Sequence, residues 1–288
     1  MDRLSSELLG FAPDARVLIV NCDDFGMHDA VNAAVVEPIE SGIVSSCSLM
    51  VPCPAAANGM RLLRERPHIS FGIHFALIRD KREYRWGPAA AKADVPSLLH
   101  PDTNELYVDT PAERTALLAT AKLTEVEREL RAQINTVVDA GLAPTHLDWH
   151  CLADGGRADI LDLEMALARE YGLAARVWLD EGRRKARVHG KPVVDNAFLD
   201  SFSVSLHDKA ATYERMLRDL RPGLTVGPSI QRTAPKNGRR SSRLAGESGT
   251  PTTRSSPHHS TRDPRSGRHQ HHRLPATARG VERVAACQ

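Results

Sequence analysis

The stretch that decides the fold is Val17-Leu-Ile-Val-Asn-Cys-Asp-Asp-Phe-Gly26. Residues 17–20 are apolar and mostly β-branched, which predicts a strand buried on both faces. The run then reaches two adjacent carboxylates, Asp23 and Asp24, followed by the turn signal Phe25-Gly26. Neighbouring like charges at the end of a buried strand repel each other unless a cation or a shared proton lies between them. The structural alternative is that an Asp here caps the next helix. Two adjacent Asp residues with suitable histidines downstream make this alternative the weaker one.

Strand and helix patterns alternate along the chain around this stretch. The helical segments carry apolar residues at intervals of three and four and end at Gly or Pro, whereas the strand segments are short apolar runs. Alternating strands and helices imply right-handed crossovers and a parallel sheet. The predicted strands are 17–21, 44–51, 69–77, 146–150, 174–179 and 202–206, and the predicted helices are 30–41, 55–66, 124–140, 160–171 and 209–220.

Residues 78–123 form a long irregular connection between these units, and loops of this length are usually functional or disordered. Repeated β/α units over residues 1–224 fit a barrel better than an open sheet. The expected fold class is therefore α/β, with a TIM-like (β/α) barrel. Only five or six strands precede residue 225, so we expect the barrel to be incomplete or distorted.

The composition of the chain changes near Thr225. Residues 225–288 carry 12 Lys and Arg against three Asp and Glu, with six large aliphatic residues and no Phe, Trp, Tyr or Met. Such a segment buries too little apolar surface to offset its ordering entropy, which predicts a disordered, basic, low-complexity C-terminal tail. The predicted organisation is a barrel at 1–224 and a tail at 225–288, and a frameshifted reading of a GC-rich gene would give a tail of this composition.

The bulk properties argue against several classes of protein. No segment has the ~20 consecutive apolar residues of a membrane helix, and Met1–Arg16 lacks the apolar core of a signal peptide. The five cysteines are odd in number and never spaced C-x-x-C, which predicts free thiols in a reducing cytoplasm and argues against a zinc–cysteine site. The basic tail lacks the aromatic residues or folded module of a specific nucleic-acid binder.

Histidines on two predicted strands are partners for the Asp pair. His74 lies near the end of its strand, where a lone histidine is more often a core residue than a ligand. His146, Asp148 and His150 alternate with apolar residues and so share one face, with His150 nearest the carboxyl end. In a barrel these strand ends meet at the rim that carries the Asp pair. One carboxylate and two imidazoles would then hold a divalent metal, and the second carboxylate would be free to act as a base.

Four ordered segments resemble the motifs of the YdjC/ChbG-type carbohydrate deacetylases. They are Asn21-Cys-Asp-Asp-Phe-Gly26, Gly42-Ile-Val-Ser-Ser-Cys-Ser-Leu-Met50, Gly72-Ile-His-Phe75 and Pro144-Thr-His-Leu-Asp-Trp-His150. The resemblance extends over residues 16–224. It implies a TIM-like barrel, distantly similar to NodB-type polysaccharide deacetylases, and the metal-dependent removal of acetyl groups from N-acetylated sugars.

The resemblance also implies roles for individual residues. Asp24, His74 and His150 match the metal ligands, for which Mg²⁺ or Zn²⁺ is the expected ion, and Asp23 matches the catalytic base. Arg176 lies where the family often has an arginine at the site, which implies a contact with the substrate. A surface ion pair is the equal alternative for Arg176.

The chain departs from the family pattern in two places. After His150, many relatives continue with further histidines and an aromatic-proline turn, whereas this chain has Cys151-Leu-Ala-Asp-Gly-Gly-Arg157. The family's late His-Pro-Gly type motif, a candidate for the general acid, is absent from the sequence after Leu224. His146 is a conceivable substitute, but it lies about two residues deeper along its strand, roughly 7 Å.

The expected function is metal-dependent hydrolysis of an N-acetyl group on a mono- or oligosaccharide by a cytoplasmic enzyme. Its expected partner is the N-acetylated sugar, without a membrane or a specific nucleic acid, and a homodimer is left open. Because the general acid is missing, the activity of this exact chain is in doubt. The alternative is a truncated, catalytically impaired relative that binds metal and sugar without turnover.

Overall fold

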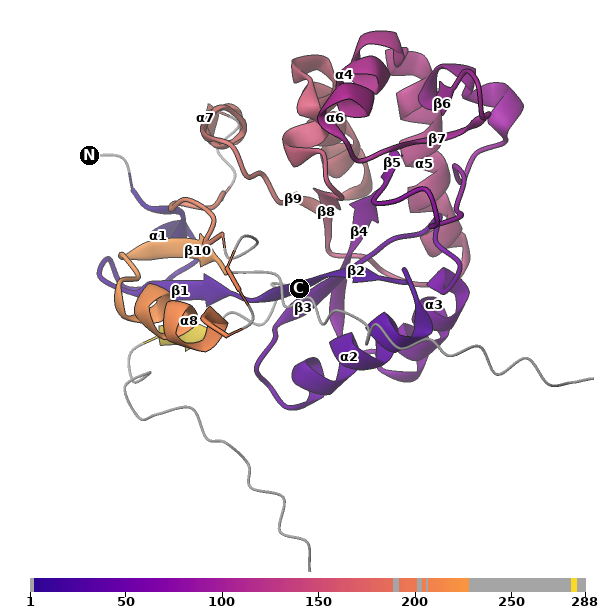
Figure 1. The fold of residues 1–288 in the computed structure, drawn as a ribbon. Helices are drawn as coiled ribbons and strands as arrows, with labels where there is room; N and C mark the ends of the chain where they lie inside the picture. Colours follow the sequence, from indigo (N-terminus) through magenta and orange to yellow (C-terminus); the bar gives the residue numbers. More distant parts are fainter. Residues whose placement is uncertain (1–2, 189–191, 201–203, 206, 228–280, 284–288) are drawn as a thin grey trace, which may run out of the picture.

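The computed structural model describes residues 3–188, 192–200, 204–205, 207–227 and 281–283 (Figure 1). Parallel strands form its centre and helices pack against them, so the predicted α/β class with a parallel sheet is confirmed. Among the residues described, no helix is both long and apolar enough to span a bilayer.

The central sheet has five parallel strands in the order β2-β3-β4-β8-β9. A second parallel set, β10-β1-β11, adjoins it because β1 leads into β2 across Val20 alone, and a third sheet has the order β5-β7-β6. The strands are β1 (Arg16–Ile19), β2 (Asn21–Phe25), β3 (Ser46–Leu49), β4 (Ser70–Phe75), β5 (Ile78–Arg79), β6 (Leu99–His100), β7 (Glu105–Val108), β8 (His146–Trp149), β9 (Ala174–Ala175), β10 (Gly223–Val226) and β11 (Val281–Arg283).

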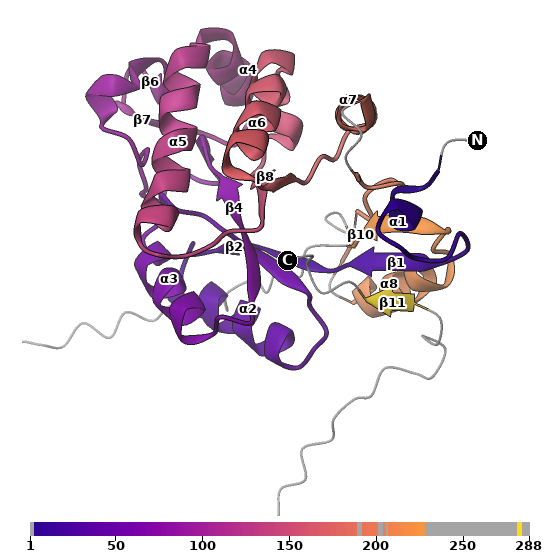
Figure 2. The ribbon, with the colours of Figure 1, turned by 180° about the vertical axis from the view of Figure 1, so that it is seen from behind.

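Helices α5 and α6 lie side by side against the central strands (Figure 2), and α2 packs against both α3 and β2. The helices are α1 (Ser5–Leu8), α2 (Asp29–Glu40), α3 (Ala56–Glu65), α4 (Pro111–Thr120), α5 (Leu123–Asp139), α6 (Ala158–Tyr171), α7 (Asp180–Val188) and α8 (Lys209–Arg218). Short 3-10 turns are η1 (Lys92–Asp94), η2 (Pro96–Leu98) and η3 (Ala153–Gly156).

The core beneath the site includes a buried carboxyl group. Trp149 is buried, and its ring lies 5.2 Å from that of Phe75 on the neighbouring strand. The indole Nε1–H of Trp149 donates a hydrogen bond of 2.7 Å to Glu164 of α6, and burial raises the pKa of Glu164 well above its usual range. A neutral carboxylic acid can satisfy the indole without leaving a buried charge, so this contact joins α6 to β8.

The turn after β2 requires the glycine of the Phe25-Gly26 pair. Gly26 has φ +94°, a conformation that side chains rarely adopt, and a Cβ there would lie 2.9 Å from a methyl carbon of Leu49. Its N–H donates to Asn32 Oδ1 at 2.6 Å, which joins the turn to α2. The single strand predicted at 17–21 is therefore two strands, β1 and β2, and β2 contains both carboxylates and ends at Phe25.

The expected barrel is not closed by the described strands. Among these residues, no pairing joins β9 to β10, so the described sheets leave an opening between them. The incomplete barrel remains a prediction.

Other expectations need correction at particular segments. Strand β9 is only two residues long, and the connection at 78–123, expected to be irregular, contains the helix α4. The boundary at residue 224 falls inside β10, where Thr225 and Val226 are buried and pair with β1. Residues 281–283 also pair with β1. The rest of the predicted tail and most of the strand expected at 202–206 lie outside the described residues.

Candidate active site

Asp23 and Asp24 reach the same region because both lie in an irregular part of β2 between Cys22 and Phe25. The register shifts by one residue between the pairs Cys22–Cys47 and Phe25–Leu49, and Asp24 has φ +64°. In a regular strand, adjacent side chains point to opposite faces, whereas an extra residue in a bulge redirects one of them. A left-handed backbone at a residue other than Gly costs about 1–3 kcal/mol and is found mainly at functional sites.

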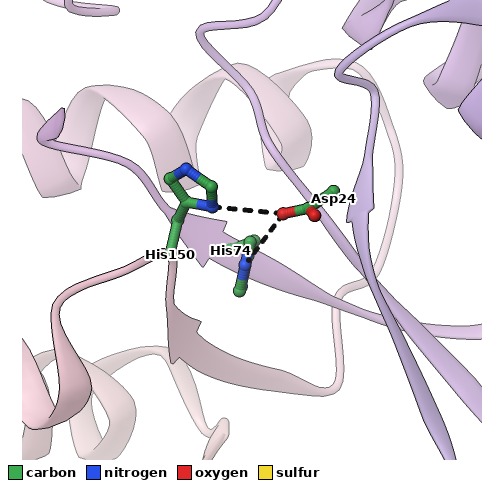
Figure 3. A group of neighbouring side chains, drawn as sticks. All are labelled: Asp24, His74 and His150. Carbon is green, nitrogen blue, oxygen red and sulfur yellow. Dashed lines mark hydrogen bonds and ion pairs between the residues drawn. The ribbon is translucent and has the colours of Figure 1, made fainter. Parts of the chain in front are cut away.

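Two histidines converge on one oxygen of Asp24 (Figure 3). Asp24 Oδ1 lies 3.5 Å from His74 Nε2 and 3.1 Å from His150 Nδ1. The two imidazole rings meet edge to face, with their centroids 5.4 Å apart. All three residues are buried. The structure thus brings together the three residues that the resemblance matches to metal ligands.

Each histidine is oriented by a second carboxylate on its other nitrogen. His74 Nδ1–H donates to Asp148 Oδ1 at 2.6 Å, and His150 Nε2–H donates to Asp80 Oδ2 at 3.0 Å. A carboxylate on one ring nitrogen fixes the orientation of the ring and makes the other nitrogen a better metal ligand. Both rings therefore present their remaining nitrogen to Asp24.

Arg176 forms ion pairs with two carboxylates of the site, Asp23 and Asp148. Its Nη2 lies 2.8 Å from Asp23 Oδ1 and 2.9 Å from Asp148 Oδ2. Asn21 Nδ2 also donates to Asp23 Oδ1 at 2.7 Å, and the hydroxyl of Ser48 donates to Asp148 Oδ2 at 2.6 Å. Arg176 is 8% exposed, so its ion pairs are buried at the site, and the alternative of a surface ion pair is wrong.

The charges of these groups support one another. Burial opposes ionisation of Asp24, but the hydrogen bonds from His150 and His74 hold its pKa well below the usual range. Burial also opposes a charged His74, yet Asp148 and Asp24 raise its pKa to about 9. For His150, Asp24 and Asp80 overcome the burial penalty and raise the pKa well above the usual range. Without a metal, each ring therefore carries a proton on the nitrogen that faces Asp24.

These residues fit a divalent cation. A cation could replace the two protons that lie between Asp24 and the imidazoles, because it attracts the same lone pairs. Ligand atoms bound at about 2.1 Å to a common ion are about 3.0–3.5 Å apart, and the distances from Asp24 to the two rings fall in this range. A second group, Asp23, His74 and Asp148, also lies within ligand distance, but Arg176 already neutralises its two carboxylates.

Sequence reasoning missed two of the orienting groups. The alternation of residues 146–150 predicts that Asp148 lies on the polar face of its strand but indicates no role for it. Asp80 lies at the start of the connection expected to be irregular. Register is the signal for Asp148, because it pairs directly with His74 across β4 and β8. No comparable pattern precedes Asp80, which reaches His150 from the end of β5.

His146 lies beneath the site and is not a substitute for the missing general acid. Its Nε2 is 3.2 Å from Ser48 Oγ, its Nδ1 is 2.9 Å from Thr145 Oγ1, and burial lowers its pKa to about 4. The ring packs over Gly72, where a Cβ would come within 2.3 Å of it. An imidazole that is neutral at neutral pH lacks the acidic second proton that a general acid gives to a leaving amine.

Replacing His146 with Ala should therefore reduce stability more than metal binding. The change opens a cavity over Gly72 and removes one of several partners of the buried Ser48 hydroxyl, at an expected cost of about 2–4 kcal/mol. Urea unfolding and metal titration of the same preparation measure the two effects. Unchanged stability with lost metal affinity would reverse the assignment.

Comparison with known proteins places the chain in a family of carbohydrate enzymes. A family model described as YdjC-like protein matches residues 17–258, which extends beyond residue 224. The carbohydrate deacetylase of Geobacillus stearothermophilus is 34% identical over 191 residues, which are 66% of this chain and 69% of that protein. The chitooligosaccharide deacetylase of Serratia marcescens is 31% identical over 206 residues, covering 70% of this chain and 76% of that one.

A solved structure supports the fold. A protein from Enterococcus faecalis V583, named for a proposed role in cellobiose-phosphate cleavage, aligns with a TM-score of 0.62 at 22% identity. The alignment covers 76% of this chain and 83% of that one. At this identity the likeness concerns the arrangement of strands and helices.

Proposed function

This chain belongs to the YdjC-like family, and we propose on that premise that it is a metal-dependent deacetylase of N-acetylated mono- or oligosaccharides. The two relatives described above are named carbohydrate deacetylase and chitooligosaccharide deacetylase, which supports this class of substrate and reaction. The predicted family is thereby confirmed, while the metal, the site residues and the sugar belong to the proposal.

One observation carries the proposal: both imidazoles converge on Asp24 Oδ1, and each is oriented from behind by another carboxylate. A structural ion pair needs one histidine and one acid. Two oriented imidazoles on one carboxylate oxygen are the donor set of a divalent metal site, and positions remain for water and substrate. We assign Asp24, His74 and His150 as the ligands of Mg²⁺ or Zn²⁺.

A metal bound there would polarise the acetamide carbonyl and make a water molecule more acidic. The protein's own contribution is to hold the donors in place before the substrate arrives. Asp148 and Asp80 fix the two rings, so no side-chain reorientation has to accompany binding. Burial of the whole group strengthens each of these electrostatic contacts.

Asp23 is assigned as the general base. It is adjacent in sequence to Asp24, and the bulge turns both carboxylates toward His74. Asn21 and Arg176 both donate to its Oδ1, which fixes the plane of the carboxylate. A base held in this way can accept a proton from water at the site without first losing an orientation.

Arg176 is assigned to substrate binding as well as to positioning Asp23. Its Nη2 serves the two carboxylates, whereas its buried Nε has no hydrogen-bond partner among the described residues. A buried donor without an acceptor is costly, so an oxygen of the substrate would stabilise it. Trp86 lies edge-on to His150, with 6.5 Å between ring centroids, and Tyr84 is stacked on Trp86; aromatic side chains of this kind suit sugar rings.

The proposal is tested by incubating metal-free and metal-loaded protein with N-acetylated mono- and oligosaccharides and measuring both products. We expect acetate and an equal amount of free amine on the sugar, only with the divalent metal. The enzyme proposal fails if metal and sugar bind but neither product forms, since that result matches the catalytically impaired alternative. Cleavage of a glycosidic bond in place of the amide would contradict the reaction assigned.

A further inference from the structure

The outer edge of His150 faces a second group of metal-binding side chains. His150 Nε2 lies 3.0 Å from Asp80 Oδ2 and 3.3 Å from the sulfur of Cys151. These three donor atoms all lie within 4.8 Å of one another. They are on the side of the ring opposite the nitrogen that faces Asp24.

The backbone presents this group to solvent. Cys151 lies two residues after the end of β8 and has φ +60°, a left-handed conformation that is uncommon outside Gly. Cys151 is partly exposed, and the side chain of Asp80 is 31% exposed, so a dissolved ion can reach both. Asp109, which Arg114 holds by an ion pair, is near enough for its charge to act on the thiol of Cys151.

We propose that Asp80, His150 and Cys151 form a second metal site, selective for a thiophilic divalent cation such as Zn²⁺, whose occupation inactivates the enzyme. The donor types decide the selectivity. A thiolate, an imidazole and a carboxylate suit Zn²⁺, whereas Mg²⁺ prefers oxygen ligands and retains its water. The observed separations of 3.0 and 3.3 Å between donor atoms match those around a common Zn²⁺ with little rearrangement.

Inactivation follows from the shared imidazole. When Zn²⁺ binds at Nε2, the thiol and Nε2 release their protons to solvent, and the remaining ring proton is on Nδ1. Nδ1–H then donates to Asp24 Oδ1. The metal site proposed at Asp24, His74 and His150 thereby loses one imidazole ligand, and its carboxylate loses a free lone pair. A neutral ring has one lone pair and cannot supply both sites.

The absence of C-x-x-C spacing predicts no zinc–cysteine site, but that argument concerns only clusters with several cysteines. Here the fold adds a single cysteine to a histidine and an aspartate from a different strand end. The inhibitory consequence rests on the proposed function, whereas the metal site itself does not. The two parts are therefore tested by separate measurements.

The site is tested by titrating metal-free protein with Co²⁺, which takes zinc positions and absorbs in the near-ultraviolet when a thiolate is bound. We expect this charge-transfer band in the wild type and in Cys53→Ala, and its loss in Cys151→Ala. Cys53 is the matched control because it is a buried cysteine whose charge would also be felt by His150. A band that persists in Cys151→Ala, or no band at saturating Co²⁺, overturns the site.

The inhibitory role is tested by adding Zn²⁺ to enzyme that is active with an oxygen-preferring metal. We expect the wild type to lose activity, and the half-inhibiting concentration of Zn²⁺ to rise by about tenfold or more in Cys151→Ala. Equal inhibition of both proteins overturns the inhibitory role even where the cobalt band is present. If the wild type shows the band but no deacetylation with any metal, the proposed function fails and the site stands.

Discussion

Replacement of Asp24 with Asn is expected to weaken metal binding by about 100-fold or more and to abolish turnover. Asparagine keeps the shape of the side chain but removes the negative charge on which both imidazoles converge. His74→Ala and His150→Ala each remove one of the other two donors and should act in the same direction. Calorimetric titration of metal-free protein measures the affinities directly.

The control for this series is Asp29→Asn, the same change at an exposed aspartate in the first turn of α2. It should bind metal like the wild type. Thermal unfolding must show that each site variant is folded under the assay conditions. Unchanged metal affinity in all three site variants would end the assignment of the metal site.

Replacement of Asp23 with Asn is expected to have a different signature: metal binding is retained and the rate falls by ~10²–10⁴. The carboxylate lies beside the metal ligands and is assigned to take a proton from water, which an amide cannot do. Its orientation is held by Asn21 and Arg176, and the amide oxygen can still accept those hydrogen bonds. The fold and the metal site at Asp24, His74 and His150 should therefore persist.

Metal titration and single-turnover kinetics of Asp23→Asn separate these two effects. Turnover near that of the wild type would move the base to another residue. Loss of metal together with activity would make Asp23 a ligand instead. Arg176→Lys is the companion variant, since it keeps a positive charge for Asp23 and Asp148 but removes the Nε–H assigned to the substrate.

The order of strands and helices could be predicted from the sequence because each core element has a clear local signal. Parallel strands bury Val17 and Leu18 of the apolar run before Asp23, and residues 147–149 of the alternating segment. Carboxyl ends of such strands lie at one edge, so the residues that follow them meet. That rule brings Asp24, His74 and His150 together without knowledge of the side-chain geometry.

The finer geometry of the site could not be predicted. A regular strand would point Asp23 and Asp24 to opposite faces, and nothing in the sequence marks the bulge that brings them together. Asp80 lies beyond the last apolar residues of its strand, where periodicity gives no information. Its contact with His150 depends on how a long connection returns to the sheet.

The domain boundary expected at residue 224 falls inside β10 for a different reason. Gly223–Val226 is too short to show a period, and a composition change one residue before its end hides the strand. Pairing with β1 is a tertiary effect, since Arg16 to Ile19 provide the complementary backbone.

The central claim is that Asp24, His74 and His150 hold a divalent metal. Anomalous X-ray diffraction from crystals equilibrated with Mn²⁺ tests it most directly, because the signal locates the ion independently of activity. The account predicts a single strong peak bounded by Asp24 Oδ1, His74 Nε2 and His150 Nδ1. No peak between these atoms at saturating Mn²⁺, or a peak only at another group of side chains, would contradict it.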